Sequence, residues 1–285
     1  MNLPALALAF GVAWTPVNVP VSRGVPVVAQ APAGSVFDAT GAARTWDEAL
    51  ADLASATVVA VGESHDSVAD HNLQAEVLTA LAARTPKLAV AFEMVCYEDQ
   101  AVLDSFMSGA LSEAGFAVWW KKNWGYDYSL YKPIFDAAKA AKLQAFGLNA
   151  PIGLVKAVSK GGLASLSPAD RARLPFQIMQ SADPRYRQYV LDAVSGHGPL
   201  TPDQLRNRLE AMAVWNETMG EKISLLTAEG RTVLVIAGQG HVLYKAGILE
   251  SAARRGAGPV KALLPLIAAP QPDELAYADW FRITP

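Results

Sequence analysis

The sequence has a single cysteine, Cys96, and only four histidines among its 285 residues. One cysteine excludes an internal disulfide, a CxxC redox pair, a thiolate zinc cluster and a CxxCH site for covalent haem. Any metal ion would therefore have to be held by histidine, carboxylate or tyrosine side chains.

Blocks of like charge are also absent. The formal net charge is −3, and basic and acidic residues are interspersed along the chain. Binding to the phosphate backbone of a nucleic acid requires a basic patch or stripe. The sequence therefore predicts no nucleic-acid partner.

Long apolar runs are missing after the first residues. An apolar run from Leu3 to Trp14, a Pro/Val-rich stretch and an A-x-A tripeptide at residues 29–31 are typical of an export signal. We therefore expect residues 1–35 to be a leader and the protein to be exported, periplasmic or associated with the cell envelope. No later run approaches the roughly 20 residues of a membrane span, so none is expected in the mature protein. No cysteine precedes Cys96, which argues against a lipoprotein.

Short, nearly continuous apolar segments alternate with helical patterns from residue 45 onward. Strands are predicted at residues 57–61, 87–92, 143–151, 232–241 and 260–267, and Thr45 with Glu48 forms a capping-box pattern before a short helix. Such runs are typical of parallel strands covered by helices on both faces. The expected fold class is α/β, with a mostly parallel central sheet flanked by helices. Residues 36–285 are expected to form one domain, in which residues 152–229 are a helical insertion or cap between the third and fourth strands.

Each of the first four predicted strands ends in polar residues. The first is followed by Glu63 and His65, the second by Glu93, the third by Asn149 and the fourth by His241. Ligands of open α/β sheets bind outside the carboxyl ends of the strands. We therefore expect these side chains to converge on one edge of the sheet.

The strand-end carboxylates and imidazoles are suitable ligands for zinc, manganese or iron. One hypothesis is that His65, Glu93 and His241 hold a divalent metal ion while Glu63 acts as general base on bound water. The alternative is that these groups simply pair with one another, because charges beyond buried strands are costly unless they are paired or coordinated.

His71 and Gln74 stand three residues apart near the start of the next predicted helix, for which Ser67 and Asp70 provide an N-cap. They therefore share one helix face, close to His65. Either they help to line a pocket or they form hydrogen bonds with neighbouring loops.

A second group of candidate residues lies in VWWKKNWGYDYSLYKPIF, residues 118–135. The segment combines aromatic residues and lysines: Trp119, Trp120, Trp124, Tyr126, Tyr128, Tyr131, Phe135, Lys121, Lys122 and Lys132. Aromatic faces beside cations suit a flat dianionic ligand such as a porphyrin, and tyrosine oxygen can ligate haem iron. The alternative is ordinary packing of aromatic side chains.

Several segments, taken in order, resemble the ChaN-like haem-binding uptake proteins. This family belongs to the Tiki superfamily, together with erythromycin-esterase-like proteins. The segments are VGESHDSVADHNLQ, AFEMVCYEDQAVLDSFMSG, NWGYDYSLYKPIFDAAKAAKLQAFGLNAP, WNETMGEKI and VIAGQGHVLYKAGI, and the resemblance covers about residues 45–284.

The resemblance implies an α/β domain that binds haem for iron uptake at the bacterial cell envelope, with haem sandwiched in a homodimer and held by tyrosine. Candidate haem contacts are then His65, His71, Trp124, Tyr126, Tyr128, Tyr131 and His241, with Tyr244 as a further candidate iron ligand. Superfamily relatives use the positions of Glu63, His65, Glu93 and His241 for metal-dependent or hydrolytic chemistry. A helical motif that often reads W-D-E-T-M has Asn216 here, which puts a full catalytic set in doubt.

Three hypotheses therefore come from the sequence. The first is an envelope haem-binding protein whose cofactor is haem. The rival is a metal-dependent hydrolase of the Tiki or erythromycin-esterase-like type, with a divalent metal ion and a Glu/His site. The third is a scaffold whose strand-end polar groups only pair with each other.

Overall fold

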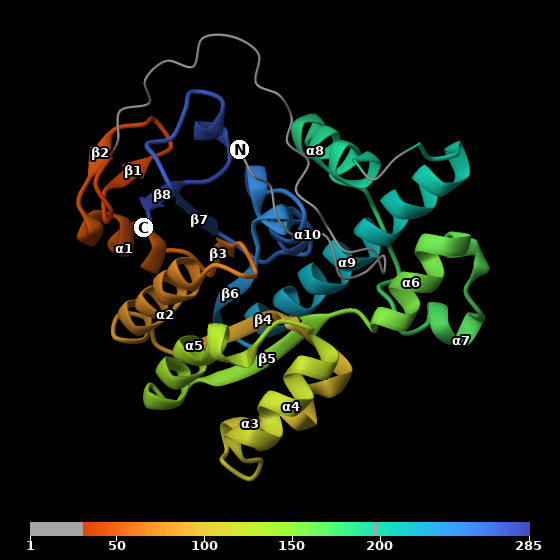
Figure 1. Ribbon diagram of the computed structural model, residues 1–285, viewed down its shortest axis with the longest axis horizontal. Coiled ribbons are helices and arrows are strands. Elements are labelled where there is room, and N and C mark those ends of the chain that lie inside the picture. The colour runs from red at the N-terminus through yellow and green to blue at the C-terminus, as the bar shows by residue number, and fades with distance from the viewer. Residues whose placement is uncertain (1–30, 197–198) are drawn as a thin grey trace.

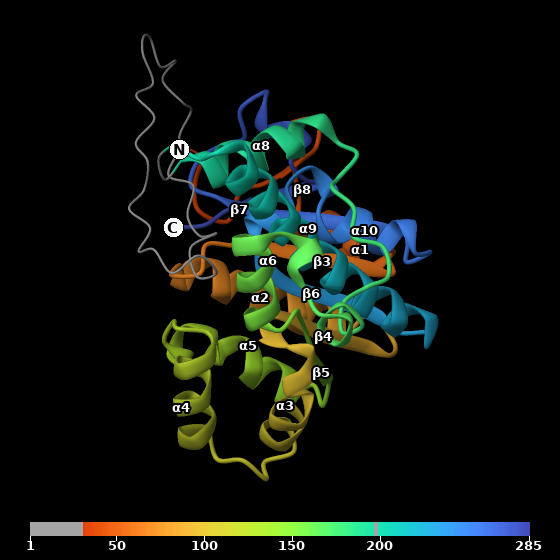
Figure 2. The same cartoon turned by 90° about the vertical axis from the view of Figure 1, so that its right-hand side faces the viewer.

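The computed structural model describes residues 31–196 and 199–285, so nearly all of the leader predicted at residues 1–35 lies outside the described residues. Within them an eight-stranded sheet runs through the molecule in the order β2-β1-β8-β7-β3-β6-β4-β5, with helices on both faces (Figures 1 and 2). This α/β architecture confirms the predicted fold class.

The central strands are parallel and the edge is mixed. The strands are β1 Val36–Asp38, β2 Ala43–Arg44, β3 Val58–Glu63, β4 Leu88–Cys96, β5 Gln144–Asn149, β6 Thr232–Gly238, β7 Val260–Leu266 and β8 Trp280–Ile283. Strands β3 to β8 pair in parallel, whereas β1 pairs antiparallel with both β2 and β8. The sequence pattern predicted β3 to β7 and missed the three short strands β1, β2 and β8.

The starts of several helices are set by local capping residues as well as by packing. They are α1 Trp46–Ala54, α2 Val68–Ala82, α3 Gln100–Met107, α4 Glu113–Asn123, α5 Tyr128–Ala140, α6 Ile152–Gly161, α7 Pro168–Arg171, α8 Pro184–Ser195, α9 Pro202–Ala228 and α10 Ile248–Arg254. Thr45 and Glu48 form the predicted capping box of α1, and the Ser67 side chain accepts a hydrogen bond from Asp70 N at the start of α2. Helices α6 to α9 form the predicted helical insertion between β5 and β6.

Alternate residues of each central strand face two different cores. In β3, Val58 and Ala60 pack with α6, α8, α9 and α10, whereas Val59 and Val61 pack with α1 to α5. All four side chains are fully buried, which is why β3 reads as a continuous apolar run rather than as an alternating one. Helices α3 and α4 form a lobe that projects beyond β5 (Figure 2).

The strand order places β6 between β3 and β4. Consequently the carboxyl ends of these three parallel strands are adjacent, and each carries a polar residue. Glu63 ends β3, Glu93 lies near the end of β4, and His241 follows Gly238, the last residue of β6. The predicted convergence on one sheet edge is confirmed for these strands.

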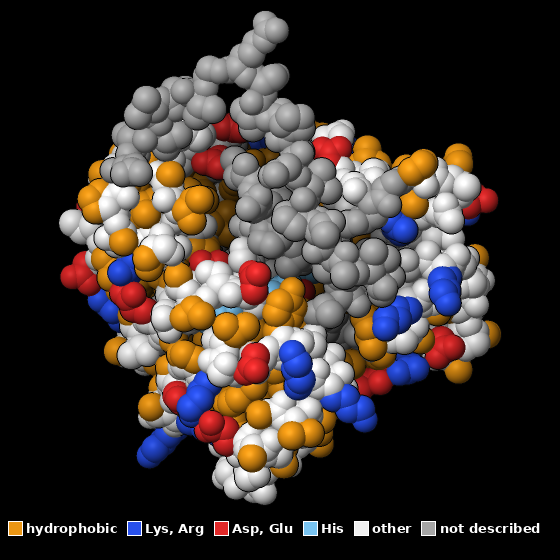
Figure 3. All heavy atoms as spheres, in the orientation of Figure 1, with side chains coloured by type: hydrophobic (Ala, Val, Ile, Leu, Met, Phe, Trp, Pro, Cys, Tyr) orange, Lys and Arg blue, Asp and Glu red, His pale blue; other side chains and the backbone are white. Residues whose placement is uncertain are grey.

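Charges of both signs are interspersed over the face of the molecule in Figure 3. Among the residues that the structure describes, no helix is both long enough and apolar enough to cross a membrane. The long helix α9, which covers one face of the sheet, has polar and apolar residues along its length and packs against α10.

At Gly220 the backbone of α9 packs closely against α10. A Cβ built on it would meet the Ser251 side chain and would lie 2.8 Å from the backbone nitrogen of Ala252. Real Cβ atoms essentially never approach backbone so closely. The helical contact therefore depends on glycine at this position.

We expect Gly220→Ala to destabilise the protein by about 1–3 kcal/mol through overpacking, although alanine favours helices over glycine. The measurement is urea unfolding of parent and variant. Gly153→Ala in α6 is the matched control, because nothing lies within 4 Å of a Cβ there, and it should be neutral or stabilising by up to about 1 kcal/mol. Equal stabilities of the two variants would contradict this account of the α9–α10 contact.

Candidate functional site

The first polar cluster is centred on Glu63, which is fully buried at the end of β3. Its Oε1 accepts hydrogen bonds from the Tyr131 hydroxyl at 2.6 Å and from Nδ1 of His65 at 2.7 Å. Its Oε2 lies 3.1 Å from Nε2 of His71, at ion-pair distance. The nearby side chain of Gln74 instead donates to the carbonyl of Val61 at 3.0 Å, which holds α2 on β3.

These contacts determine the charge of the cluster. Burial alone would raise the pKa of Glu63, but the hydrogen bond from His65 and the contact with His71 bring it down from 4.5 to about 2. Burial opposes a charged imidazole at His65, yet the hydrogen bond to Glu63 and the negative charge of Glu93 raise its pKa. The Glu63 carboxylate also raises the pKa of the buried Tyr131 hydroxyl beyond the effect of burial, so that hydroxyl stays a donor.

The second cluster is centred on Glu93 and His241. Glu93 Oε2 accepts a hydrogen bond from Gly238 N at 2.6 Å, and its Oε1 lies 3.3 Å from Nε2 of His241. Nδ1 of His241 donates to Asn216 Oδ1 at 2.7 Å. The amide of Asn216 in turn donates to the Tyr186 hydroxyl at 3.0 Å. Burial would raise the pKa of Glu93, but His241, His65 and the Gly238 amide together lower it.

Gly238 brings the two clusters into contact. A Cβ at this position would lie 2.7 Å from Cε1 of His65 and 3.5 Å from Oε2 of Glu93. The imidazole of His65 therefore packs against the bare backbone of β6, beside the Glu93 carboxylate. Any larger residue would push His65 away from the second cluster.

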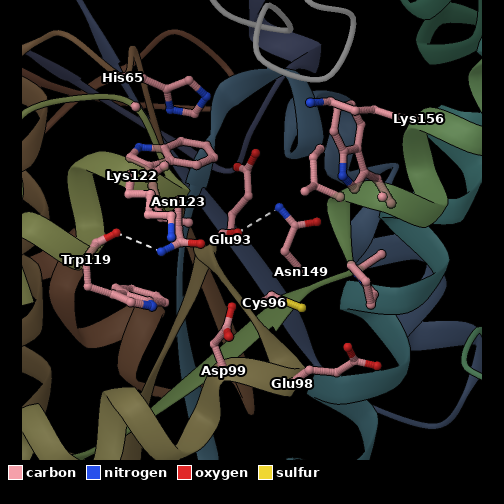
Figure 4. Close-up of a pocket in the computed structure, with 18 of the residues that line it drawn as sticks. His65, Glu93, Cys96, Glu98, Asp99, Trp119, Lys122, Asn123, Asn149 and Lys156 are labelled. Carbon is pink, nitrogen blue, oxygen red and sulfur yellow. Dashed lines mark hydrogen bonds between the residues drawn. The ribbon is translucent and has the colours of Figure 1, made fainter.

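A cavity of about 470 Å³ opens over the second cluster and His65 (Figure 4). Its lining includes three carboxylates from β4 and the following turn, two lysines and three tryptophans, besides Cys96 and Asn149. These are Glu93, Glu98, Asp99, Lys122, Lys156, Trp119, Trp124 and Trp215. In Figure 4, Lys122 and Lys156 lie on opposite sides of the cavity, with Glu93 and Asn149 between them. The size is typical of small-molecule sites.

The aromatic segment 118–135 splits between the cavity and the core. Trp124 lines the cavity and packs edge-on against His65, with ring centroids 4.8 Å apart, and Tyr126 lies 5.4 Å from the same imidazole. Tyr126 is partly exposed, whereas Tyr128 and Tyr131 are buried in the helical core. Burial raises the pKa of the Tyr128 hydroxyl, so it is held as a neutral phenol.

Two other candidates lie away from the cavity lining. His71 is fully buried against Tyr131, with ring centroids 4.1 Å apart, and belongs to the cluster around Glu63. Tyr244 packs edge-on against Tyr277 at 5.0 Å, with the Arg185 guanidinium over its ring. The cavity thus gathers seven of the sequence-predicted residues: His65, Glu93, Trp119, Lys122, Trp124, Asn149 and His241.

Sequence reasoning missed Trp215 and Lys156 as site residues. Trp215 reaches the cavity from α9 and packs edge-on on His241, with ring centroids 5.8 Å apart. Trp215 is the first residue of the W-N-E-T-M motif, so that motif could have identified it as a site residue. Lys156 projects from α6, and no pattern in the sequence distinguishes it from the other exposed lysines.

The structure does not support a divalent metal ion at His65, Glu93 and His241. Among the residues described, no group of three or more His, Cys, Asp or Glu side chains is arranged to hold a metal ion. Instead, Nε2 of His241 lies 3.3 Å from Oε1 of Glu93, and Oε2 of Glu93 accepts a hydrogen bond from Gly238 N, so these groups pair with one another. The pairing expected under the third hypothesis is therefore present, but it surrounds an open cavity.

The low pKa of Glu63 makes folding stability pH-dependent. Since the carboxyl binds its proton near pH 4.5 when unfolded and near pH 2 when folded, its contribution is complete above pH 4.5 and is lost as the pH falls towards 2. We expect Glu63→Gln to lose about 3 kcal/mol at pH 7 and to lose less further stability than the parent between pH 5 and pH 3.

Urea unfolding at pH 7, 5 and 3 measures both effects. Glu76→Gln is the control on the neighbouring helix α2, because Glu76 is an exposed partner of Arg282 and its loss should cost less than about 1 kcal/mol. The same pH slope in the parent and in Glu63→Gln would contradict the assignment.

Comparison with known proteins identifies the family. Residues 49–251 match the family described as haem-binding uptake, Tiki superfamily, ChaN. No curated protein matches.

Among solved structures, ChaN of Campylobacter jejuni, described for cofacial haem binding, superposes with a TM-score of 0.69 at 17% identity, covering 89% of this chain and 97% of that one. The type III effector HopBA1 superposes at 0.50 with 14% identity, covering 83% of this chain and 91% of that one. An erythromycin esterase scores 0.42 at 12% identity, covering 77% of this chain and 72% of that one. The match over most of the chain, on a fold shared with ChaN, places this protein in the ChaN-like family of haem-binding uptake proteins of the Tiki superfamily.

Proposed function

We propose that this protein binds haem in the cavity beside His65 and His241, as part of haem or iron uptake at the cell envelope. The observation that carries the proposal is the composition of the cavity wall. Three tryptophan rings and two lysines surround a space of about 470 Å³, next to the partly exposed Tyr126. Flat apolar faces with cations at the rim suit a porphyrin that carries two propionates.

Tyr126 is the tyrosine best placed to ligate ferric iron. It is partly exposed and contacts two cavity residues, Trp124 at 5.9 Å and His65 at 5.4 Å between ring centroids. Burial and nearby carboxylates raise the pKa of its hydroxyl, so the free protein keeps it protonated. Ferric iron would have to displace that proton, since tyrosine ligates haem iron through its oxygen.

The buried imidazoles supply a polar wall rather than iron ligands in this proposal. His65 is fixed by Glu63 through Nδ1, which leaves Nε2 as its free ring nitrogen within the part of the chain described. His241 is fixed by Asn216 in the same way. Both rings are therefore oriented before a ligand binds, which lowers the entropy cost of binding.

Lys122 and Lys156 would each meet a haem propionate at the rim. Lys122 comes from α4 and Lys156 from α6, and both are exposed. They lie on opposite sides of the cavity, so a cation is available on each side (Figure 4). The family resemblance implies haem sandwiched in a homodimer, where these lysines would hold the propionates.

The iron ligand is tested by hemin titration followed through the Soret band. We expect the parent to bind hemin and Tyr126→Phe to lose the tyrosinate spectrum and weaken binding by at least about tenfold. Tyr128→Phe is the matched control, two residues away but buried in the core, and should titrate like the parent. No spectral change in the parent would reject haem binding, and an unchanged Tyr126→Phe would reject this ligand.

The lysines are tested by charge reversal. Lys156→Glu should weaken hemin binding by about tenfold. Raising the salt concentration should reduce the difference in hemin affinity between parent and variant, because exposed charges are screened. Lys160→Glu, at an exposed position on the same helix outside the cavity, is the control and should bind hemin like the parent. Equal affinities of the two variants would exclude Lys156 from the site.

A further inference from the structure

A second cavity, of about 410 Å³, lies on the other side of α9 from the first. Neighbouring residues of that helix face different cavities: Trp215 lines the first, and Asn216 lines the second. The remaining walls come from α8, from α10 and from the segment 179–181. The proposed haem site uses none of this space.

The second cavity has an apolar part and a polar part, each about half of its lining. The apolar part includes Met179, Pro184, Val190, Leu191, Leu209, Met212 and Ala213. Val190 and Met212 are buried, whereas Met179 is 45% exposed at the cavity margin. Methionine side chains adapt to ligands of different shape, so this wall suits a flexible hydrocarbon chain.

The buried polar groups of this cavity already have partners. The Tyr186 hydroxyl donates to the carbonyl of Gly240 at 2.9 Å and accepts from Asn216. Asn216 also accepts the hydrogen bond from His241. These groups therefore form a closed wall and do not require a polar ligand.

The carboxylates of the cavity are also paired. Glu217 is buried and forms ion pairs with Arg254 and with Arg255, the latter at 2.6 Å. Glu250 bonds to the Ser181 hydroxyl and accepts from Ala182 N at 2.8 Å. Neither acid is available to a cationic ligand without breaking these contacts.

Arg187 differs from the other charged groups of the lining. Its Nη1 donates to the carbonyls of Ser181 at 2.9 Å and Ala182 at 2.6 Å, which holds the guanidinium beside the cavity wall. Within the described ranges 31–196 and 199–285 it forms no ion pair. Its positive charge and its remaining N–H groups are therefore available to an anion.

We infer that the second cavity binds an amphipathic monoanion of the alkyl carboxylate class. The carboxylate would contact Arg187 at the mouth, and the alkyl chain would lie between Met179, Met212 and Val190. A charged head beside a fixed guanidinium and an alkyl tail against the apolar part of the wall, which includes Met179 and Met212, account for both features of the lining. The inference does not depend on haem binding.

The probe is octanoate, titrated calorimetrically into haem-free protein. We expect saturable binding of one octanoate per chain, and a loss of affinity of about ten- to hundredfold in Arg187→Gln, the effect of removing one charge-assisted contact. Octan-1-ol, which has the same chain without the charge, should bind more weakly than octanoate by a similar factor. Arg206→Gln is the control, because Arg206 is exposed on α9 and pairs with Asp203 outside the cavity.

Filling the cavity provides the second test. Met212→Trp should abolish octanoate binding while hemin binding in the first cavity is retained, which separates this inference from the proposed function. If Met212→Trp does not fold, Leu209→Trp, at a partly buried position of the same wall, replaces it. The inference is overturned if octanoate does not bind, if a folded cavity-filling variant binds it like the parent, or if Arg187→Gln and Arg206→Gln have equal affinities.

Discussion

The site depends on the pairing of two buried carboxylates with imidazoles at the ends of adjacent parallel strands. Ionised Glu63 and Glu93 would each cost several kcal/mol to bury without partners. His65, His71 and His241 supply those partners, and the strand order brings them together because β6 lies between β3 and β4. Once paired, these groups orient the imidazoles of His65 and His241 towards a cavity. The pairs that offset the free-energy cost of burying the carboxylates therefore also form part of the cavity wall.

Much of the fold could be predicted because the central strands are buried on both faces. Such strands read as apolar runs whatever the tertiary context, and the capping residues of α1 and α2 act locally. The strands β1, β2 and β8 were missed because they have only three, two and four residues, too few to show a pattern. Strand β2 has only two residues, both exposed, and exists through pairing with β1, which no local pattern records. Strand β4 also runs on to Cys96, beyond the point where its pattern was predicted to end.

The site could be predicted in position but not in detail. The rule that ligands bind at strand carboxyl ends located Glu63, Glu93 and His241 on one edge. It could not show that Glu93 and His241 pair with each other and that the described residues form no group able to hold a metal ion. Nor could the spacing of Tyr126, Tyr128 and Tyr131 show which tyrosine is accessible, because this depends on how α5 packs over α2.

Asn216 shows how one residue type determines the charge and the hydrogen bonds around His241. An aspartate there would place another negative charge beside the His241–Glu93 pair and would lack the N–H that Asn216 donates to Tyr186. The neutral amide instead fixes the order of donors from His241 through Asn216 and Tyr186 to the carbonyl of Gly240. The chain of hydrogen bonds holds the imidazole in place without adding charge, and it also forms the partition between the two cavities.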